Sequence, residues 1–201
     1  MNIDKLIFVD LETTGFDPEV NQIMQISAVD CFTGEIFNEY VRFRTNHMNS
    51  RALEINHYNE DLWEEKAITQ KKAFYAFQEW LSKRLYYTRT NKKGEEYNTA
   101  MIAGHNLSCF DINFLKEWEC MFCDSLHIDY ACFDTLQLAR WLLPELDSHS
   151  LERLCYYYEI DVEDLHNSLT DVLCNVKIAY KILSDMVTAP KWHRSLYERI
   201  K

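Results

Sequence analysis

Glycine is scarce in this chain, with four residues out of 201, at positions 15, 34, 94 and 104. Proteins contain about 7% glycine on average. Dinucleotide-binding folds require G-x-G-x-x-G, and P-loop nucleotidases require G-x-x-x-x-G-K-[ST]. Because the four glycines are widely separated, neither motif can form, and both classes of nucleotide-binding protein are excluded.

Positive charge is also in short supply. Lys and Arg together number 21 against 32 Asp and Glu, which gives a net charge of −11 and a pI near 5.1. This balance argues against a broad basic face that grips long nucleic acid through many phosphates. It leaves room for a small active site in which carboxylates hold metal ions and the metal ions bind phosphate.

The sequence has no hydrophobic run of membrane-spanning length, and charged residues interrupt its first segment at Asp4, Lys5 and Asp10. We therefore expect no membrane partner and no signal peptide. Seven cysteines, an odd number, fit free thiols in a reducing compartment better than a disulfide framework. These features predict a soluble cytoplasmic protein, and the 47% hydrophobic content excludes disorder over most of it.

Alternating and helical hydrophobic patterns follow one another along the chain. They predict strands at 5–12, 22–31, 36–43, 99–106 and 127–133, and helices at about 70–86, 110–122, 135–142, 150–158 and 168–187. Early strands and late helices indicate one α/β domain around a mixed sheet. We expect this domain to span 1–201, with a core to about 188 and a short basic tail at 189–201. The polar residues 88–98 predict an exposed excursion.

Two acids, Asp10 and Glu12, stand at the end of the first predicted strand. Side chains two positions apart on a strand leave the same face. The two carboxylates therefore repel each other unless one binds a proton or a cation lies between them. Capping of the turn at the strand's end is the simpler explanation for a lone D-x-E pair.

Two further acids, Asp111 and Asp171, open predicted helices and point the way the apolar stripe of each helix points. The stripes consist of Leu115, Trp118 and Phe122 after Asp111, and of Ile178 and Ile182 after Asp171. The helix dipole alone favours an acid at a helix start, and Ser168-x-x-Asp171 also matches a capping box. Four inward carboxylates, however, need a compensating charge, because an unpaired buried carboxylate is costly.

No lysine or arginine is comparably placed in these segments, whereas hard divalent cations accept carboxylate oxygens readily. The acids therefore predict a metal site. His166 precedes Asp171 by five residues, an offset that would turn it about 140° away on a continuous helix. We expect it on the loop before the helix, where it can act as a general base. A surface histidine without a role is the alternative.

Three segments that carry these residues resemble the motifs of the DEDDh, or DnaQ-like, 3′→5′ exonucleases. They are Phe8-Val9-Asp10-Leu11-Glu12-Thr13-Thr14-Gly15, His105-Asn106-Leu107-Ser108-Cys109-Phe110-Asp111 and His166-Asn167-Ser168-Leu169-Thr170-Asp171. The likeness runs in order over nearly the whole chain. It is greatest to the proofreading subunit of bacterial DNA polymerase III and to ribonuclease T-like enzymes. One departure is Glu159, which stands where the family often has glycine.

The resemblance implies an RNase H-like α/β fold, with a mixed sheet of about five strands flanked by helices. It implies a metal-dependent 3′→5′ exonuclease acting on single-stranded or frayed ends, with DNA favoured and RNA left open. Two Mg²⁺ or Mn²⁺ ions would be held by Asp10, Glu12, Asp111 and Asp171, and His166 would be the base. By position, the residues assigned to the 3′-terminal nucleotide are Leu11, Thr13, Asn106, Phe110, His57 and Met48. A polymerase or another holding partner is a further expectation, because an acidic chain grips nucleic acid weakly.

Other interpretations stay open on the sequence alone. The same fold could serve as a non-catalytic module that binds nucleic acid or a polymerase. Cys120-x-x-Cys123 with His127 and Cys132 allows a zinc site, although free cysteines commonly pack as small apolar residues. Asp134 stands three residues before Gln137, the spacing of a capping box, and we interpret it as structural.

Overall fold

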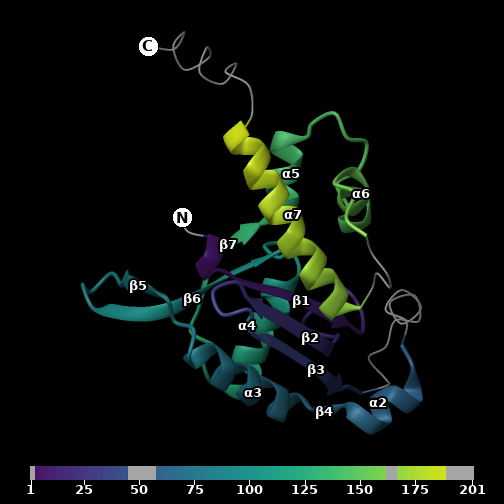
Figure 1. The fold of residues 1–201 in the computed structure, drawn as a ribbon. Helices are drawn as coiled ribbons and strands as arrows, with labels where there is room; N and C mark the ends of the chain where they lie inside the picture. Colours follow the sequence, from purple (N-terminus) through teal and green to yellow (C-terminus); the bar gives the residue numbers. More distant parts are fainter. Residues whose placement is uncertain (1–2, 45–57, 162–166, 189–201) are drawn as a thin grey trace.

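A mixed sheet of seven strands runs through the middle of the molecule (Figure 1). The structure, a computed structural model, describes residues 3–44, 58–161 and 167–188. The strands are β1 (Ile7–Thr13), β2 (Ile23–Asp30), β3 (Ile36–Arg42), β4 (Ile68–Thr69), β5 (Tyr87–Thr90), β6 (Glu96–Gly104) and β7 (Ile128–Asp134). Their order is β4-β3-β2-β1-β6-β5, and β7 also pairs with β6. The pairs β1–β6, β6–β7 and β3–β4 are parallel, whereas β1–β2, β2–β3 and β5–β6 are antiparallel.

The predicted mixed sheet is confirmed, but the expected number of about five strands is too low. The strands that the prediction omits are β4, which has two residues, and β5, which has four. A two-residue strand is too short to show an alternating pattern, and β5 lies in the polar segment taken for an excursion. Both strands extend the sheet at its margins.

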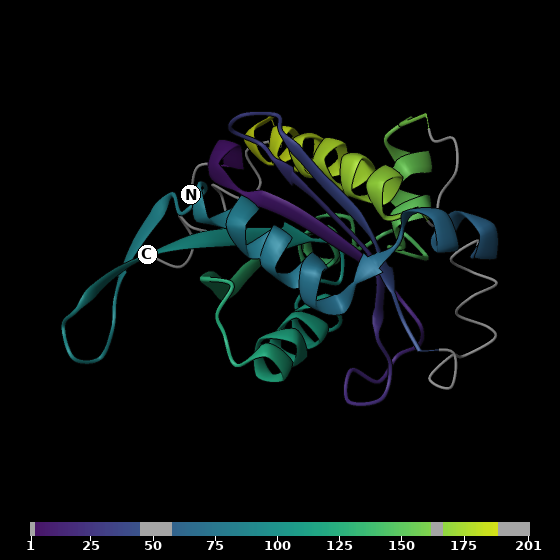
Figure 2. The same cartoon turned by 90° about the horizontal axis from the view of Figure 1, so that it is seen from below.

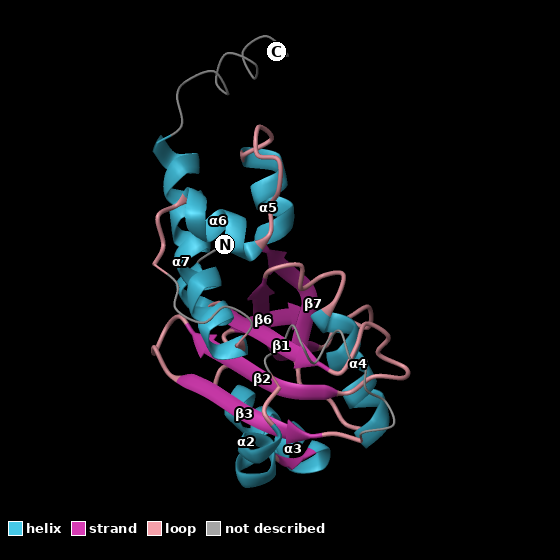
Figure 3. Ribbon diagram, turned by 90° about the vertical axis from the view of Figure 1, so that its right-hand side faces the viewer, coloured by secondary structure: helices cyan, strands magenta, loops and turns pink. Residues whose placement is uncertain are grey.

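Helices cover both faces of the sheet, as Figure 3 shows. On one face, α3 (Gln70–Ser82) and α4 (Asp111–Phe122) share a buried cluster with Ile7 and Val9 of β1. On the other face, Phe8 of β1 belongs to a cluster with Val172 of α7 (Ser168–Thr188). Because side chains alternate along a strand and both faces are covered, β1 is continuously apolar up to Asp10.

Three shorter helices and one 3-10 turn complete the described elements. Ala139 of α5 (Thr135–Leu142) and Leu154 of α6 (Leu151–Tyr157) pack in one cluster with Ile178 of α7. The others are α2 (Glu60–Lys66) and η1 (Ile3–Lys5). Within the described residues, every helix is too short or too polar to cross a bilayer.

The polar excursion at 88–98 is a two-stranded arm that reaches away from the body of the molecule (Figure 2). It consists of β5, the turn after it and the first part of β6, which begins at Glu96 rather than at the predicted residue 99. β6 runs parallel to β1, so the arm lies at the start of β6 and the segment leading to Asp111 leaves from its other end. The arm and the carboxylates of β1 are therefore at opposite ends of the sheet.

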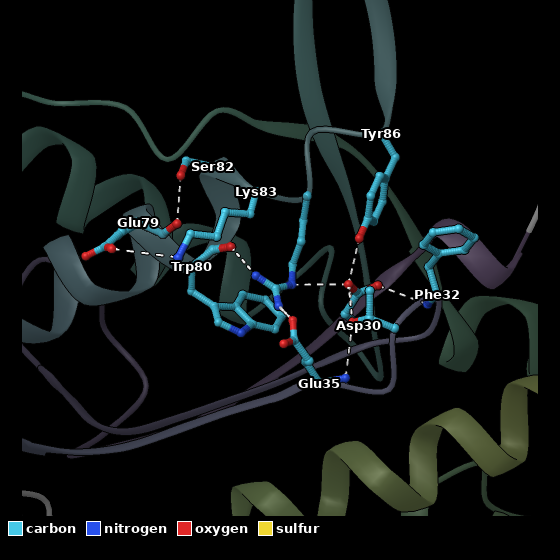
Figure 4. A network of polar contacts seen from close by, with 10 residues as sticks. Asp30, Phe32, Glu35, Glu79, Trp80, Ser82, Lys83 and Tyr86 are labelled. Carbon is cyan, nitrogen blue, oxygen red and sulfur yellow. Dashed lines mark hydrogen bonds and ion pairs between the residues drawn. The ribbon is translucent and has the colours of Figure 1, made fainter.

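The helix predicted to reach residue 86 ends at Ser82, because the next residues enter a buried polar network (Figure 4). Arg84 is only 3% exposed, and its Nε lies 3.1 Å from Oδ2 of Asp30. The guanidinium also pairs with Glu35 and stacks over the ring of Trp80 at 3.8 Å. Asp30 accepts a further 2.7 Å hydrogen bond from the hydroxyl of Tyr86. The network ties the β2–β3 turn to the end of α3.

Candidate active site

Three acidic side chains from two separate elements meet at the end of β1. Asp10 and Glu12 leave the same face of that strand, and Asp171 lies in the first turn of α7. Each offers a carboxylate oxygen, and the three oxygens lie within 4.8 Å of one another. Glu12 and Asp171 are buried, at 8% and 9% exposed. The packing of α7 against the β1 face thus brings together acids that are 159 or more positions apart.

The fourth predicted acid, Asp111, contacts the same strand from the start of a different helix, α4. It is the first residue of α4 and is 4% exposed. Its Oδ1 accepts a 3.1 Å hydrogen bond from the backbone N–H of Leu11. Because Leu11 stands between Asp10 and Glu12, this bond places Asp111 beside the other three acids.

Burial raises the pKa values of Asp10, Glu12 and Asp111, and repulsion by the neighbouring acids adds to the shift at Asp10 and Glu12. Burial is the main cause of the raised pKa of Asp10, and the charges of Asp111, Glu12 and Asp171 add to it. The pKa of Glu12 is raised by burial and then by Asp171 and Asp111. Burial raises the pKa of Asp111 to about 7, against the lowering effect of its backbone hydrogen bonds. Such a cluster favours either bound protons or a bound cation.

The first turn of α7 is capped by Asn167. Its Oδ1 accepts a 3.1 Å hydrogen bond from Leu169 N–H, and the N–H of Asp171 donates to the Asn167 carbonyl at 2.9 Å. Ser168, the expected cap residue, is instead inside the helix and fully buried, with its Oγ 2.5 Å from Oγ of Ser27 on β2. The capping-box explanation for Asp171 is therefore wrong.

The donor set at this site suits a hard divalent cation. Carboxylate oxygens are the ligands that Mg²⁺ and Mn²⁺ prefer, and a cation would offset the repulsion that raises the pKa values. Over residues 3–44, 58–161 and 167–188, no other cluster brings three His, Cys, Asp or Glu ligand atoms this close. The structure therefore does not bring the ligand atoms of Cys120, Cys123, His127 and Cys132 together in this way.

Four of the six residues expected to contact a terminal nucleotide lie within the described residues, on two segments. Leu11 and Thr13 are on β1, where the Leu11 N–H is engaged by Asp111 and the Thr13 Oγ1 donates to the Gly15 carbonyl at 2.7 Å. Asn106 and Phe110 are in the loop before α4, and Asn106 has a left-handed φ of 61°. Three predicted residues, His57, Met48 and the base His166, lie outside the described residues.

Two side chains to which the sequence assigned no role, Phe16 and His105, contact the loops and elements around these residues. The ring of Phe16, 65% exposed, lies 6.3 Å from that of Phe110, so the loops after β1 and before α4 meet there. His105 Nδ1 lies 3.1 Å from Thr135 Oγ1, and burial lowers the pKa of His105 to about 4. His105 is therefore neutral at pH 7. His105 is part of the second motif, but the sequence predicted no role of its own for it.

This sequence matches a part of each of several much longer proteins. The PolC-type DNA polymerase III of Oceanobacillus iheyensis is 26% identical over 92% of this chain, and that of Bacillus subtilis is 25% identical over 89%. The chain spans 12% and 11% of those two relatives.

Solved structures share its fold. E. coli exonuclease I in complex with a dT13 oligonucleotide matches with a TM-score of 0.69 and 18% identity, over 96% of this chain and 42% of that one. Exonuclease I from Methylocaldum szegediense matches with a TM-score of 0.66 and 19% identity, over 96% and 44%. These matches confirm the predicted RNase H-like α/β architecture.

A family model shows the relationship directly. The model RNase_T, described as exonuclease, matches residues 7–93 and 96–179, which contain the three motifs in order. The chain therefore belongs to the DEDDh, DnaQ-like family of 3′→5′ exonucleases.

Proposed function

We propose that this protein is a metal-dependent 3′→5′ exonuclease. It hydrolyses the 3′-terminal phosphodiester of single-stranded or frayed ends, preferably of DNA, and releases nucleoside 5′-monophosphates. The observation that carries the proposal is that carboxylate oxygens of Asp10, Glu12 and Asp171 lie within 4.8 Å of one another. Asp111 joins them through its hydrogen bond to the backbone N–H of Leu11, the residue between the first two acids. A binding module would gain nothing from four acids that repel one another and a phosphate.

The chain's own residues divide the work of the reaction. Asp10, Glu12 and Asp171 hold the metal ions, and Asp111 completes the acidic set. When bound, two Mg²⁺ or Mn²⁺ ions supply positive charge for both the entering and the leaving oxygen. His166 takes a proton from the attacking water, whose oxygen bonds to phosphorus while the bond from phosphorus to the 3′ oxygen breaks. The shortened strand keeps that oxygen, which is protonated to a 3′-hydroxyl.

A holding partner is part of the proposal. The net charge of −11 gives the chain little electrostatic attraction for phosphates beyond the site. We infer that digestion is weakly processive unless a second protein holds the strand. The PolC-type relatives make a polymerase the first partner to test, and a single-stranded DNA substrate agrees with the oligonucleotide complex of E. coli exonuclease I. A cytoplasmic location stays a prediction.

Labelled oligonucleotides test the activity. We expect a 5′-labelled single strand to shorten stepwise in Mg²⁺ or Mn²⁺ and a 3′-labelled strand to release labelled mononucleotide at once. EDTA abolishes both. The preferred substrate follows from the digestion rates on single-stranded DNA, single-stranded RNA and duplexes with matched or mismatched 3′ ends. Loss of the 5′ label first, or cleavage within a closed circle, contradicts the proposal.

A matched pair of variants on α7 links activity to the site. Asp171→Asn removes one carboxylate charge from the cluster and should lower kcat by roughly 10³-fold or more, since a metal ligand is lost. Asp185→Asn removes an exposed carboxylate from the same helix and should leave kcat unchanged. Equal activity of the two variants contradicts the assignment. Binding of oligonucleotides without any product, in either metal, favours the non-catalytic alternative.

A further inference from the structure

The last residue of β7, Asp134, has a carboxylate that serves two segments at once. Asp134 is buried, with 9% of the residue exposed. Oδ1 accepts from the N–H groups of Leu136 at 3.0 Å and Gln137 at 3.4 Å, which confirms the predicted cap of α5. The same Oδ1 accepts from the N–H of Asn106 at 3.1 Å.

The second oxygen of Asp134 contacts only the loop before α4. Oδ2 accepts from the N–H of Ser108 at 3.0 Å and from the Ser108 hydroxyl at 2.5 Å. A helix cap needs one acceptor oxygen, which Oδ1 provides. The Oδ2 contacts are therefore additional to capping, and they act on the second motif.

The loop that Asp134 holds has no cap of its own. Phe110, the residue before α4, makes no side-chain capping hydrogen bond. Asn106 adopts a left-handed φ of 61°, a conformation that is strained for a non-glycine residue unless its surroundings hold it. Asn106 in turn accepts backbone hydrogen bonds from Cys109 and Phe110 through its carbonyl oxygen. The path from Asn106 to Asp111 thus depends on an acid from a neighbouring strand.

We propose that Asp134 is a positioning residue for the exonuclease reaction, because its Oδ2 fixes Ser108 and so sets where Asn106 and Asp111 stand relative to β1. The inference rests on the proposed function. It goes beyond the structural role that the sequence predicts for Asp134. Asp134 acts through the loop, and we place it in contact with neither substrate nor metal.

Asp134→Asn separates the two tasks of this carboxylate. Asparagine is as good a helix cap as aspartate, and its Oδ1 keeps the Leu136, Gln137 and Asn106 contacts. Its amide nitrogen, however, is a donor facing the N–H of Ser108. We expect kcat/KM on single-stranded DNA to fall roughly 10- to 100-fold, with a higher Mg²⁺ concentration for half-maximal rate, as for lost outer contacts of metal sites. Asp129→Asn, on the same strand but paired with Arg89, is the control and should keep both values.

A second variant and a second measurement keep the test independent of folding and of activity. Ser108→Ala leaves Asp134 and its cap intact and removes only the hydroxyl, so kcat/KM should fall several-fold. Amide hydrogen exchange of the metal-free protein should quicken at Ser108 in Asp134→Asn while Leu136 and Gln137 keep their rates.

Two results would overturn the inference. One is wild-type kcat/KM in both variants together with unchanged exchange at Ser108 in Asp134→Asn. The other is faster exchange at Leu136 and Gln137 alone, which would reduce Asp134 to a helix cap. An inactive wild-type protein would instead sink the proposed function, and the exchange data would still decide whether Asp134 anchors the loop.

Discussion

The backbone N–H of Leu11 donates a 3.1 Å hydrogen bond to Oδ1 of Asp111, across 100 positions of the chain. Asp10 and Glu12 stand on either side of Leu11, so the bond couples the start of α4 to the strand that carries the first two acids. The acceptor, Oδ1 of Asp111, is buried, and the amide oxygen of an asparagine at this position could accept the same bond. The charge of Asp111 and its hydrogen bond can therefore be removed separately.

Replacing Asp111 with asparagine removes the charge and keeps the acceptor. We expect kcat to fall at least about 10²-fold, because the acidic set is incomplete. The metal-free protein should melt at a higher temperature at pH 7.5, because one repelling carboxylate is gone. Asp111→Ala loses the acceptor as well, so it should be less stable than Asp111→Asn by about 1–3 kcal/mol. Thermal unfolding and single-strand digestion measure both. Equal stability of the two variants would show that the Leu11 bond contributes nothing.

The raised pKa of Asp111 predicts how the stability of the metal-free protein changes with pH. Burial raises the pKa of Asp111 to about 7, above its unfolded value of 3.8, so the folded state binds more protons between these values. The free energy of unfolding of the metal-free protein therefore loses a contribution as pH rises through this window. We expect the melting temperature of Asp111→Asn minus that of the wild type to grow from pH 5 to pH 7 and then level off.

His105, whose pKa is lowered from 6.5 to about 4, makes stability rise with pH between these two values, opposite to Asp111. Both proteins contain His105, so its contribution cancels in the difference between their melting temperatures. Mg²⁺ or Mn²⁺ should raise the wild-type melting temperature more at pH 8 than at pH 5, because protons compete with the cation for the carboxylates. A difference between the two proteins that shrinks as pH rises contradicts the assigned shift.

The contact between Ser168 and Ser27 positions the start of α7. Their Oγ atoms lie 2.5 Å apart, and Ser27 Oγ also donates to Asn38 Oδ1 at 3.0 Å, so Ser27 accepts from Ser168. Ser168→Ala should cost about 0.5–1.5 kcal/mol, since Ser27 keeps one partner. Urea unfolding measures the cost. Lys181→Ala, at an exposed position on the same helix, should cost less, and the opposite ranking would contradict a role for the Ser27 contact.

Glu159 adopts a left-handed conformation, with φ of 53°, at the residue after the α6 cap. Its N–H bonds to the Tyr156 carbonyl and the N–H of Ile160 to that of Cys155, the pattern of a Schellman motif. Glycine adopts this φ without strain, so Glu159→Gly should stabilise the protein by about 0.5–1 kcal/mol in urea unfolding. Glu152→Gly, inside α6, should destabilise it by a similar amount. Loss of stability in both would contradict the assignment.

Much of the fold followed from local pattern. The helix predicted at 135–142 is α5 to the residue, and those at 110–122, 150–158 and 168–187 differ from α4, α6 and α7 by a residue or so at each end. These helices have clear apolar stripes and defined ends. The helix at 70–86 was too long, because Arg84 leaves it to pair with Asp30, a contact between distant positions. The sequence pattern did not predict β4, because it has only two residues, or β5, because it lies in a polar segment.

The sequence by itself predicted which acidic side chains face inward at the proposed active site. Asp10 and Glu12 share a face because a strand alternates every two residues, and Asp111 and Asp171 turn inward because a helix repeats every 3.6. Only the tertiary structure decided that the four meet, that Asn167 rather than Ser168 caps α7, and that Asp134 holds the loop before Asp111. Those contacts join residues far apart in the chain, and their geometry depends on how β1, β7, α4 and α7 pack. No local pattern records that packing.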